Sequence, residues 1–463
     1  MGPRTITEEF TVQGEWWVAG SATDRVRGTL TYKPHNVPEL EILQCFRSLP
    51  ALQLMAMAQK RARLPLVLGQ SDDGVRWSVL ECSPTSMGTE NSEPVHFYCQ
   101  EILSGHAHVA GATIQFEEVH MWFTNVAEWL RPFPPQAVKM PRVRFDFSVR
   151  PKRFLHTKIG TPPGILSLHS TFSPQYKPAA LTIHSRAHWS FVPRGGIDLR
   201  STLRFVRDCQ NFISFTLGKP ADVTRVAVLP KFTVASKGPR RAAELIYAAT
   251  KSSSGGECFA PEPLFRFDDL RPSPGKFVAA WFNLQPKIRE VVSLVLASRY
   301  VRGYVTTEFL NIIQALESMH RRLFGGTYYP EKEYDKIKDV LIDALPRTMD
   351  KDLRQRLKSS YQYANEFSLR KRLSGLVDSL APATQGRIAS DRKAFFEKII
   401  NTRNYLTHLS EKSRSASHLA DDDELQDISF ATGILTALAT TILAKAIGIN
   451  EDTAAARTFR LLR

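Results

Sequence analysis

A segment late in the chain carries arginine, asparagine and histidine at a spacing that could act on a phosphodiester. Arg403, Asn404 and His408 lie in the run Arg-Asn-Tyr-Leu-Thr-His, and the apolar residues around this run recur every three or four positions, as in a packed helix. Asn404 and His408 are four residues apart, which places them on one helix face with Arg403 beside them. The pattern therefore predicts a polar strip next to the packed face of a helix over 391–413.

These residue types suit cleavage of RNA without a metal. A histidine whose pKa is near its ordinary value of about 6.5 can accept the proton of a ribose 2′-hydroxyl. The Arg403 guanidinium can stabilise charge on the phosphoryl oxygens, and Asn404 can orient the His408 imidazole or hold a phosphate oxygen. On spacing alone the three residues are equally compatible with an ordinary solvated helix face, so both interpretations stay open at this point.

The charge balance points to a polyanionic partner. The chain has 61 lysines and arginines against 46 aspartates and glutamates, a formal net charge of +15. Cations that cluster on phosphates release counterions, which makes nucleic acid the leading candidate. Two short basic clusters, Arg321-Arg322 and Arg370-Lys371-Arg372, could grip RNA phosphates, although most such clusters are only solvated surface.

Two kinds of pattern divide the chain. Short runs of β-branched and aromatic residues, such as 26–32, 75–80 and 182–192, alternate with Gly and Pro up to about residue 250, with one helical segment at 198–216. After a turn-rich stretch at 252–276, helical periodicity prevails. The predicted fold class is α+β, with a β-rich N-terminal domain at 1–260 and an all-α helical bundle at 261–463. We expect its helices at 277–302, 305–324, 331–345, 349–379, 391–413 and 423–447.

Other chemistries find little support in the residues. The sequence has no P-loop, no Gly-x-Ser-x-Gly elbow and no His-Glu-x-x-His motif, which disfavours the corresponding hydrolases. Two histidine pairs, His106 with His108 and His184 with His188, lack a cysteine or carboxylate at fixed spacing, so we expect no metal site and no cofactor. The five cysteines form no Cys-x-x-Cys pair, which predicts buried thiols in a cytoplasmic protein.

One apolar segment has to be weighed as a membrane span. Residues 428–444 run for 17 positions without a formal charge, which is short for crossing a bilayer. Alanine, threonine and glycine are frequent in it, and an acidic run at 421–424 precedes it, as at the start of a capped helix. We therefore expect a helix buried against other helices and no membrane partner.

The motif and several upstream segments resemble a known family. The run 403–408, preceded by Glu-Phe-Leu-Asn-Ile-Ile-Gln-Ala-Leu-Glu-Ser-Met-His at 308–320, resembles the HEPN domain of the Apea family. Trp16-Trp17-Val18, Gly28-Thr29-Leu30 and the segments 103–106 and 116–129 resemble the β-rich N-terminal domain that precedes this HEPN domain in bacterial abortive-infection proteins.

The resemblance implies a homodimeric, metal-independent endoribonuclease in which two motifs face each other across the interface. Its substrate would be host tRNA or a related RNA, attacked on phage infection. Arg403, Asn404 and His408 match the catalytic positions of the family. Glu317 matches an acidic position in an earlier helix and would orient Arg403; a surface glutamate on an amphipathic helix is the alternative for this residue.

Two classes of function remain at the level of the sequence. The first is a ribonuclease held in check by its N-terminal domain, which would sense a phage-derived trigger. The second is a catalytically inert HEPN scaffold that binds nucleic acid or a protein partner. The set of Arg403, Asn404 and His408 favours the enzyme, because a pure scaffold has no physical need of such a polar strip.

Overall fold

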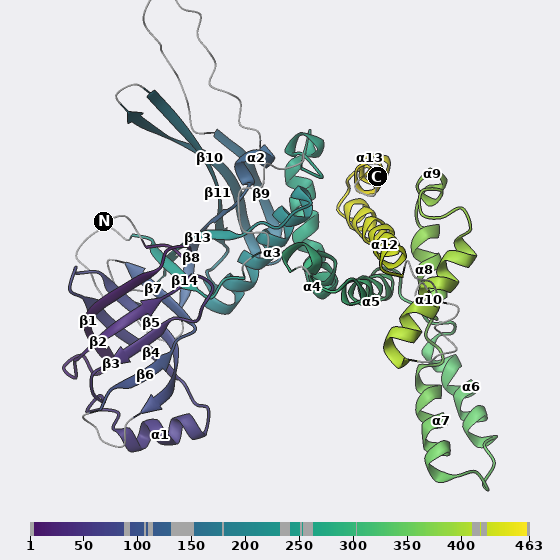
Figure 1. The fold of residues 1–463 in the computed structure, drawn as a ribbon, viewed down its shortest axis with the longest axis horizontal. Helices are drawn as coiled ribbons and strands as arrows, with labels where there is room; N and C mark the ends of the chain where they lie inside the picture. Colours follow the sequence, from purple (N-terminus) through teal and green to yellow (C-terminus); the bar gives the residue numbers. More distant parts are fainter. Residues whose placement is uncertain are drawn as a thin grey trace, which may run out of the picture. The chain divides into compact units, whose positions relative to one another are not determined.

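The computed structural model describes residues 4–87, 93–105, 108–109, 114–130, 152–177, 180–231, 241–250, 252, 263–301, 303–409, 417 and 424–460. Strands fill the N-terminal part and helices the C-terminal part, which confirms the predicted α+β class (Figure 1). Two compact units, 1–283 and 284–463, divide inside helix α4 (Pro274–Tyr300). The first turns of α4 belong to the N-terminal unit, where the indole N–H of Trp281 donates to the carbonyl of Asp208 (3.1 Å).

Six antiparallel strands of the N-terminal unit close into a small barrel. In order around the barrel they are β1 (Phe10–Val18), β2 (Val26–Tyr32), β3 (Glu39–Ile42), β6 (Val95–Tyr98), β5 (Arg76–Met87) and β4 (Leu64–Ser71), which pairs again with β1. Trp16, Leu30 and Trp77 fill the interior and are fully buried. The predicted strand at 26–32 is confirmed as β2. Helix α1 (Ala51–Gln59), which the sequence did not predict, lies against β5.

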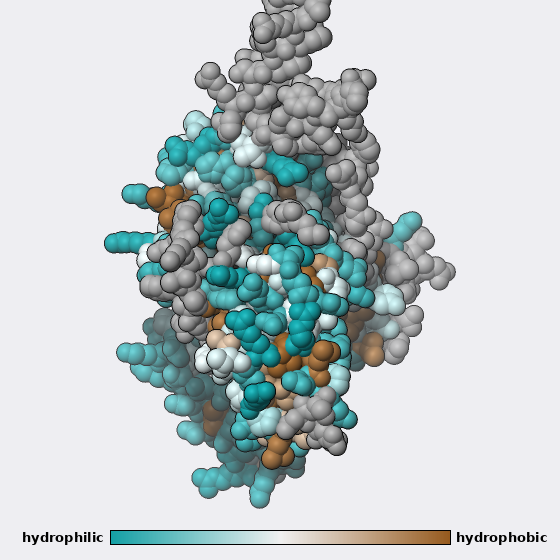
Figure 2. Space-filling model, turned by 90° about the vertical axis from the view of Figure 1, so that its left-hand side faces the viewer, coloured by the Kyte–Doolittle hydropathy of each residue, from teal (hydrophilic) through white to brown (hydrophobic). Residues whose placement is uncertain are grey.

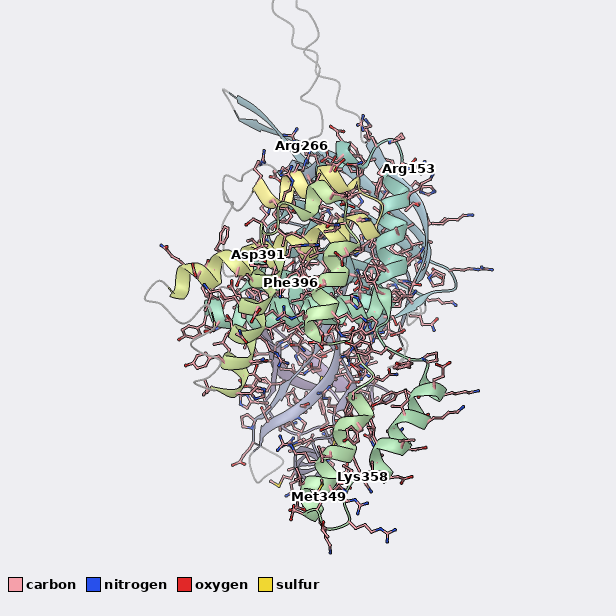
Figure 3. The ribbon with its side chains drawn as sticks, turned by 90° about the vertical axis from the view of Figure 1, so that its right-hand side faces the viewer. Arg153, Arg266, Met349, Lys358, Asp391 and Phe396 are labelled. Carbon is pink, nitrogen blue, oxygen red and sulfur yellow. The ribbon has the colours of Figure 1, made fainter. Side chains whose placement is uncertain are left out.

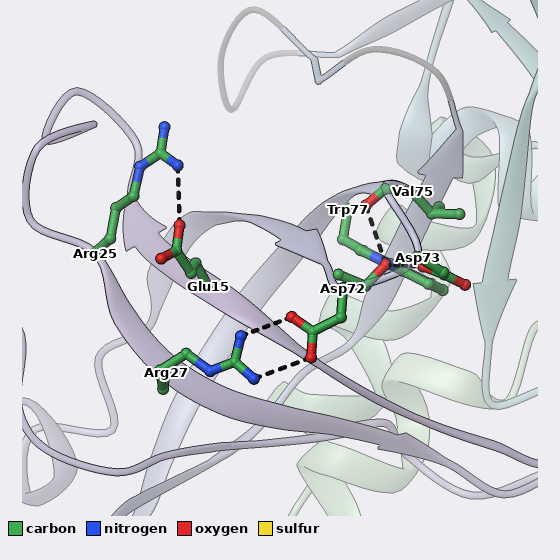
Figure 4. A network of polar contacts seen from close by, with 8 residues as sticks. Glu15, Arg25, Arg27, Asp72, Asp73, Val75 and Trp77 are labelled. Atoms are coloured by element: carbon green, nitrogen blue, oxygen red, sulfur yellow. Dashed lines mark hydrogen bonds and ion pairs between the residues drawn. The ribbon is translucent and has the colours of Figure 1, made fainter.

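The turn between β4 and β5 is fastened by polar contacts at the barrel edge (Figure 4). Arg27 of β2 donates two hydrogen bonds to the carboxylate of Asp72 (2.6 and 2.9 Å). The hydroxyl of Ser71 accepts a hydrogen bond from the Trp77 indole (2.9 Å) and donates to Asp73. These bonds fix the register in which Trp77 enters the core.

Strand β5 also joins the barrel to a second sheet, because its first half pairs with β7 (Glu101–Gly105). The sheet continues through β14 (Ala243–Tyr247), β13 (Val223–Pro230), β8 (Gln115–Phe123), β11 (Ala180–Pro193), β10 (Pro163–Lys177) and β9 (Lys152–Gly160). The short β12 (Ile197–Asp198) pairs with β8, and α2 (Val126–Leu130) follows β8. Figure 2 presents one face of the molecule, on which hydrophobic side chains form small separate groups among hydrophilic ones.

Helix α3 (Leu199–Leu217) confirms the helix that the apolar spacing over 198–216 predicted, and it packs on one face of this sheet. The carboxylate of Asp198 caps its start by accepting from the Ser201 N–H (2.9 Å), and Gly218 ends it with a φ of 73°. Phe205 lies 4.2 Å from Phe191 between ring centroids, and Phe212 lies edge-on to Trp189. Aromatic packing therefore holds the helix to the sheet.

The opposite face of the sheet carries a row of stacked rings. His188 on β11 stacks on Trp122 of β8 (ring centroids 5.1 Å apart) and on His169 of β10 (5.3 Å), and the guanidinium of Arg225 covers Trp122 (4.6 Å). Burial, followed by the nearby His120, His169 and Arg225, lowers the pKa of His188 to about 4. The imidazole of His188 is therefore neutral in the folded protein at neutral pH.

The C-terminal unit is built from helices. They are the end of α4, α5 (Val305–Phe324), α6 (Glu331–Asp343), α7 (Lys351–Tyr363), α8 (Leu369–Asp378), α9 (Pro382–Gln385), α10 (Arg392–His408), α12 (Glu424–Ala446) and α13 (Glu451–Arg460). The predicted helix over 349–379 is wrong as a single element, because the chain breaks between α7 and α8. Asn365 in this break exchanges hydrogen bonds with Tyr329 (2.9 Å each), a tertiary contact that helical periodicity does not show. Helix α13 was not predicted.

Helix α12 forms the core of this unit. Its segment Gln426–Ala446 is long and apolar enough to cross a membrane by length and composition, yet 67% of the apolar window is buried within the fold. It packs against α5 and α13, and the hydroxyls of Thr441 and Thr458 lie 2.8 Å apart between α12 and α13. The environment is that of the predicted buried helix. The acidic residues 421–423 lie outside the described residues.

The row of stacked rings predicts how the stability of the fold changes as the pH falls. Because the pKa of His188 in the fold lies below the value of about 6.5 of an unfolded histidine, the unfolded chain takes up a proton first as the pH falls below 6.5, which weakens the fold progressively down to about pH 4. Glu118, beside His120 (3.3 Å), is the nearby carboxylate. Between pH 7 and pH 5 we expect the free energy of unfolding of the parent to fall by about 1 kcal/mol more than that of the His188→Gln variant, after allowance for the partial exposure of His188.

Urea unfolding followed by tryptophan fluorescence at the two pH values measures this difference. His156→Gln, at an exposed position of β9, is the matched control and should keep the pH dependence of the parent. If the free energy of unfolding fell equally in His188→Gln and the parent, the lowered pKa of His188 would be contradicted.

Candidate functional site

The predicted motif lies in the last turns of α10, a helix whose two ends are well defined. Asp391 caps its start by accepting from the Ala394 N–H (3.0 Å). Leu409 ends it in the left-handed region, with a φ of 51°, and donates its N–H to the Tyr405 carbonyl. The chain therefore leaves the helix directly after His408, so the imidazole stands in the final turn.

One face of α10 is packed into the bundle. Phe396, Ile399 and Thr402 are buried, and the Thr402 hydroxyl donates to the Lys398 carbonyl (2.8 Å). The spacing of three and four positions predicts a packed seam of Phe395, Ile399, Thr402, Leu406 and Leu409. This seam is confirmed at Ile399 and Thr402, whereas Leu406 is only partly buried. It is wrong at its two ends, because Phe396 is buried deeper than Phe395 and Leu409 is 71% exposed.

The polar strip lies beside this packed face, as predicted. We use the name α10 strip for Glu397, Asn401, Arg403, Asn404 and His408, all of which are exposed or partly exposed. A guanidinium nitrogen of Arg403 donates to the side-chain carbonyl oxygen of Asn404 (3.2 Å). Within the part of the chain that the structure describes, the His408 imidazole makes no hydrogen bond, and the side chain is exposed.

Glu317 lies on α5, which contacts α10. Its carboxylate lies 3.6 Å from Arg321, one turn further along the same helix, and Arg321 in turn contacts Glu366 (2.7 Å). The ion pair that the structure shows for Glu317 is therefore local to α5. The orientation of Arg403 by Glu317 stays a prediction.

The three residues of the basic cluster at 370–372 differ in their burial and contacts. Arg372 is 1% exposed; it donates to the carbonyls of Phe367 (3.0 Å) and Gly325 (3.4 Å) and to the carboxylate of Glu366 (3.2 Å). It fastens the start of α8 to the turn that follows α5. Arg370 and Lys371 are exposed, so only these two residues of the cluster can meet a ligand.

A pocket of about 320 Å³ opens between α8 and α10 at the beginning of α10. Its lining consists of Arg370, Ser374, Asp378, Arg392, Lys393 and Phe396. Figure 3 labels Asp391 and Phe396 at this end of the helix. His408 is at the opposite end, about 18 Å along the axis from Phe396 at 1.5 Å per residue. The pocket is therefore separate from Arg403 and His408.

The histidine pairs that were considered as metal ligands show other contacts. The ring of His108 is buried, lies 2.8 Å from the Gly69 carbonyl oxygen and meets Trp17 edge-on. His106 and the side chain of His184 lie outside the described residues. Among the residues that are described, no three His, Cys, Asp or Glu side chains are placed to hold a metal ion. Cys45, Cys82, Cys99 and Cys209 are free and buried, and Cys258 lies outside the described part.

Two family models match the chain. The one described as ApeA N-terminal domain 1 matches residues 11–281, and the one described as Apea-like HEPN matches residues 310–453. The first match alone spans more than half of the 463 residues. Glu317 and the α10 strip fall inside the second match. No curated protein and no solved structure matches the chain.

The burial of Arg372 generates a stability prediction. We expect Arg372→Met to lower the free energy of unfolding by about 3 kcal/mol, because the loss of the buried guanidinium leaves two carbonyls without their donor and removes one of the two arginines that contact Glu366. Arg370→Met, on the exposed side of the same helix, is the control and should change stability by less than about 0.5 kcal/mol. Thermal and urea unfolding measure both. Equal stabilities for the two variants would show that Arg372 does not fasten α8.

Proposed function

Because the chain belongs to the ApeA family of HEPN proteins, we propose that it is a cytoplasmic antiphage ribonuclease that cleaves RNA at the α10 strip. An ApeA domain followed by an HEPN domain indicates a protein of antiphage defence, and HEPN domains are generally ribonuclease-like. The observation that carries the proposal for this chain is the strip itself. It places Asn404 and His408 on one helix face with Arg403 beside them, and none of the described residues hydrogen-bonds the His408 imidazole.

Three residues of the strip act in the proposed reaction. His408 takes the proton of a ribose 2′-hydroxyl, and the oxygen forms a bond to the adjacent phosphorus. The P–O5′ bond breaks, and the 5′-oxygen takes up a proton, which the protonated imidazole of a second His408 can supply. Arg403 stabilises the charge on the phosphoryl oxygens, and its hydrogen bond with Asn404 holds the guanidinium in place.

The donor set of the strip suits this route better than a magnesium-dependent one. Glu397 is the one carboxylate of the strip, and it lies 3.9 Å from the guanidinium of Arg370. Nucleases that work through Mg²⁺ hold it with several carboxylate oxygens. Attack by the neighbouring 2′-hydroxyl needs a base and a cation, and the strip offers both.

The proposed partners follow from the same chemistry. The substrate is RNA, with tRNA as the first candidate because of the family. The N-terminal unit, in which no residues were singled out for catalysis, would respond to a phage-derived trigger. These assignments rest on the family and on the α10 strip together.

The mechanism predicts the ends of the product. Cleavage should leave a 2′,3′-cyclic phosphate and a 5′-hydroxyl, should persist in EDTA, and should fail on DNA, which lacks the nucleophile. His408→Ala should lower the rate by about 10² to 10⁴, the usual range for a lost general base. Arg403→Lys should also be poorly active, since lysine lacks the planar fork. End-group analysis of the cut RNA and single-turnover rates measure these effects.

His156→Ala, an exposed histidine in the other unit, is the control and should retain the parental rate. Ends that carry a 3′-hydroxyl, or activity that disappears with chelation of divalent ions, would mean that other residues perform the reaction.

Pairing of two C-terminal units is the second expectation of the proposal. A phosphate in the transition state needs more positive donors than one Arg403 supplies, and two-fold symmetry provides a second strip. We expect light scattering to give the mass of a homodimer, and the specific activity to fall when the protein is diluted below its dimer dissociation constant. A stable monomer that cleaves RNA at the full rate would contradict the composite site.

A further inference from the structure

Three exposed aromatic side chains lie at the end of α5 and in the segment that follows it, and one of them, Tyr328, contacts a lysine of α8. Phe324 is 51% exposed, and Tyr328 and Tyr329 are each 49% exposed. The ammonium of Lys371 lies 4.3 Å from the ring centroid of Tyr328 and 4.1 Å from that of Phe367. We use the name aromatic platform for Phe324, Tyr328, Tyr329 and Lys371.

The aromatic platform is held firmly although its rings face solvent. The N–H of Tyr328 donates to the backbone carbonyl of Asn365, and Tyr329 exchanges two hydrogen bonds with the Asn365 side chain, all at 2.9 Å. The N–H of Phe367 donates to the Gly326 carbonyl (2.9 Å), and its ring meets Tyr328 edge-on. A ligand that stacks on these rings would lose little binding energy to ordering them.

Lys371 carries a charge that no carboxylate neutralises in the described part of the chain. The nearby Glu366 contacts Arg321 and Arg372, and Glu397 contacts Arg370. The ammonium of Lys371 instead rests on two ring faces, which orient it by a cation–π interaction and leave its donors available. Phosphate is the anion that such a cation beside exposed rings would meet in RNA.

Two ion pairs show toward which end of α10 the aromatic platform lies. Arg392 contacts Asp378 (2.9 Å), whereas Glu397, further along α10, contacts Arg370, which is earlier on α8 (3.9 Å). The two helices therefore run in opposite directions. As α10 proceeds to Arg403 and His408, it passes toward the start of α8, the end that carries Lys371.

We propose that the aromatic platform binds unpaired nucleotides of the RNA substrate that lie beyond the two nucleotides joined by the scissile phosphate. Bases stack on Tyr328 and Tyr329, and Lys371 contacts the backbone phosphate between them, the combination by which proteins hold single-stranded nucleic acid. Stacking tolerates any base, so the aromatic platform selects single-stranded character and not a sequence. The inference rests on the proposed ribonuclease function and adds the region of the substrate that the C-terminal unit grips.

Binding can be measured apart from cleavage in the full chain that carries His408→Ala. With a fluorescently labelled single-stranded RNA of ten nucleotides, Tyr328→Ala should weaken binding about 5- to 100-fold, the range for one lost stacking partner. Tyr328→Phe should retain the affinity. Lys371→Ala should weaken binding and reduce the slope of log affinity against log salt by about 1. Tyr304→Ala, an 84% exposed tyrosine at the other end of α5, is the matched control and should bind as the parent does.

Cleavage by the protein with His408 intact supplies the second measurement. Tyr328→Ala should raise KM for the ten-nucleotide RNA and leave kcat/KM for a dinucleotide unchanged, because a dinucleotide does not reach the aromatic platform. Affinity that is unaltered in both Tyr328→Ala and Lys371→Ala, with thermal stability maintained, would overturn the inference. If His408→Ala cleaved RNA normally, the proposed function would fail, while the binding result would stand or fall by itself.

Discussion

The buried guanidinium of Arg372 is the contact on which the geometry of the C-terminal unit depends. A charge that is 1% exposed is tolerated only because two carbonyls and a carboxylate accept its hydrogen bonds. Both carbonyls belong to the segments that it joins, the turn after α5 and the residues before α8. The hydrogen bonds between Asn365 and Tyr329 join the same two segments at a second point. The position of α8, and with it the surface against which α10 packs, follows from these bonds.

Helix α10 can display the strip that we propose to be reactive because its packed residues and its polar residues occupy different faces. Ile399 and Thr402 form the buried face of α10, so Arg403 and Asn404 beside them need not pack in the bundle. The left-handed Leu409 ends the helix directly after His408, so the imidazole lies in the last turn.

Sequence patterns predicted the elements whose residues repeat and missed those set by contacts distant in the chain. The strand at 26–32 and the helix at 305–324 were found, because alternation and helical spacing record which side chains are buried. The break between α7 and α8 was missed, since its cause is the pairing of Asn365 with Tyr329. The strip was visible as a motif, whereas the division of the cluster 370–372 into a buried Arg372 and an exposed Lys371 needed the packed helices.

The separation of the α10 strip from the aromatic platform has a consequence for how binding energy can be used. Stacking on Tyr328 and Tyr329 is the same in the ground state and the transition state, so by itself it would lower KM and not raise kcat. It contributes to the rate only if it holds the 2′-hydroxyl in line with the phosphorus, which requires a fixed distance between the rings and His408. The hydrogen bonds of Asn365 hold the backbone that carries these rings, and two ion pairs join α8 to α10. Under the proposed function, these contacts would have a catalytic use as well as a structural one.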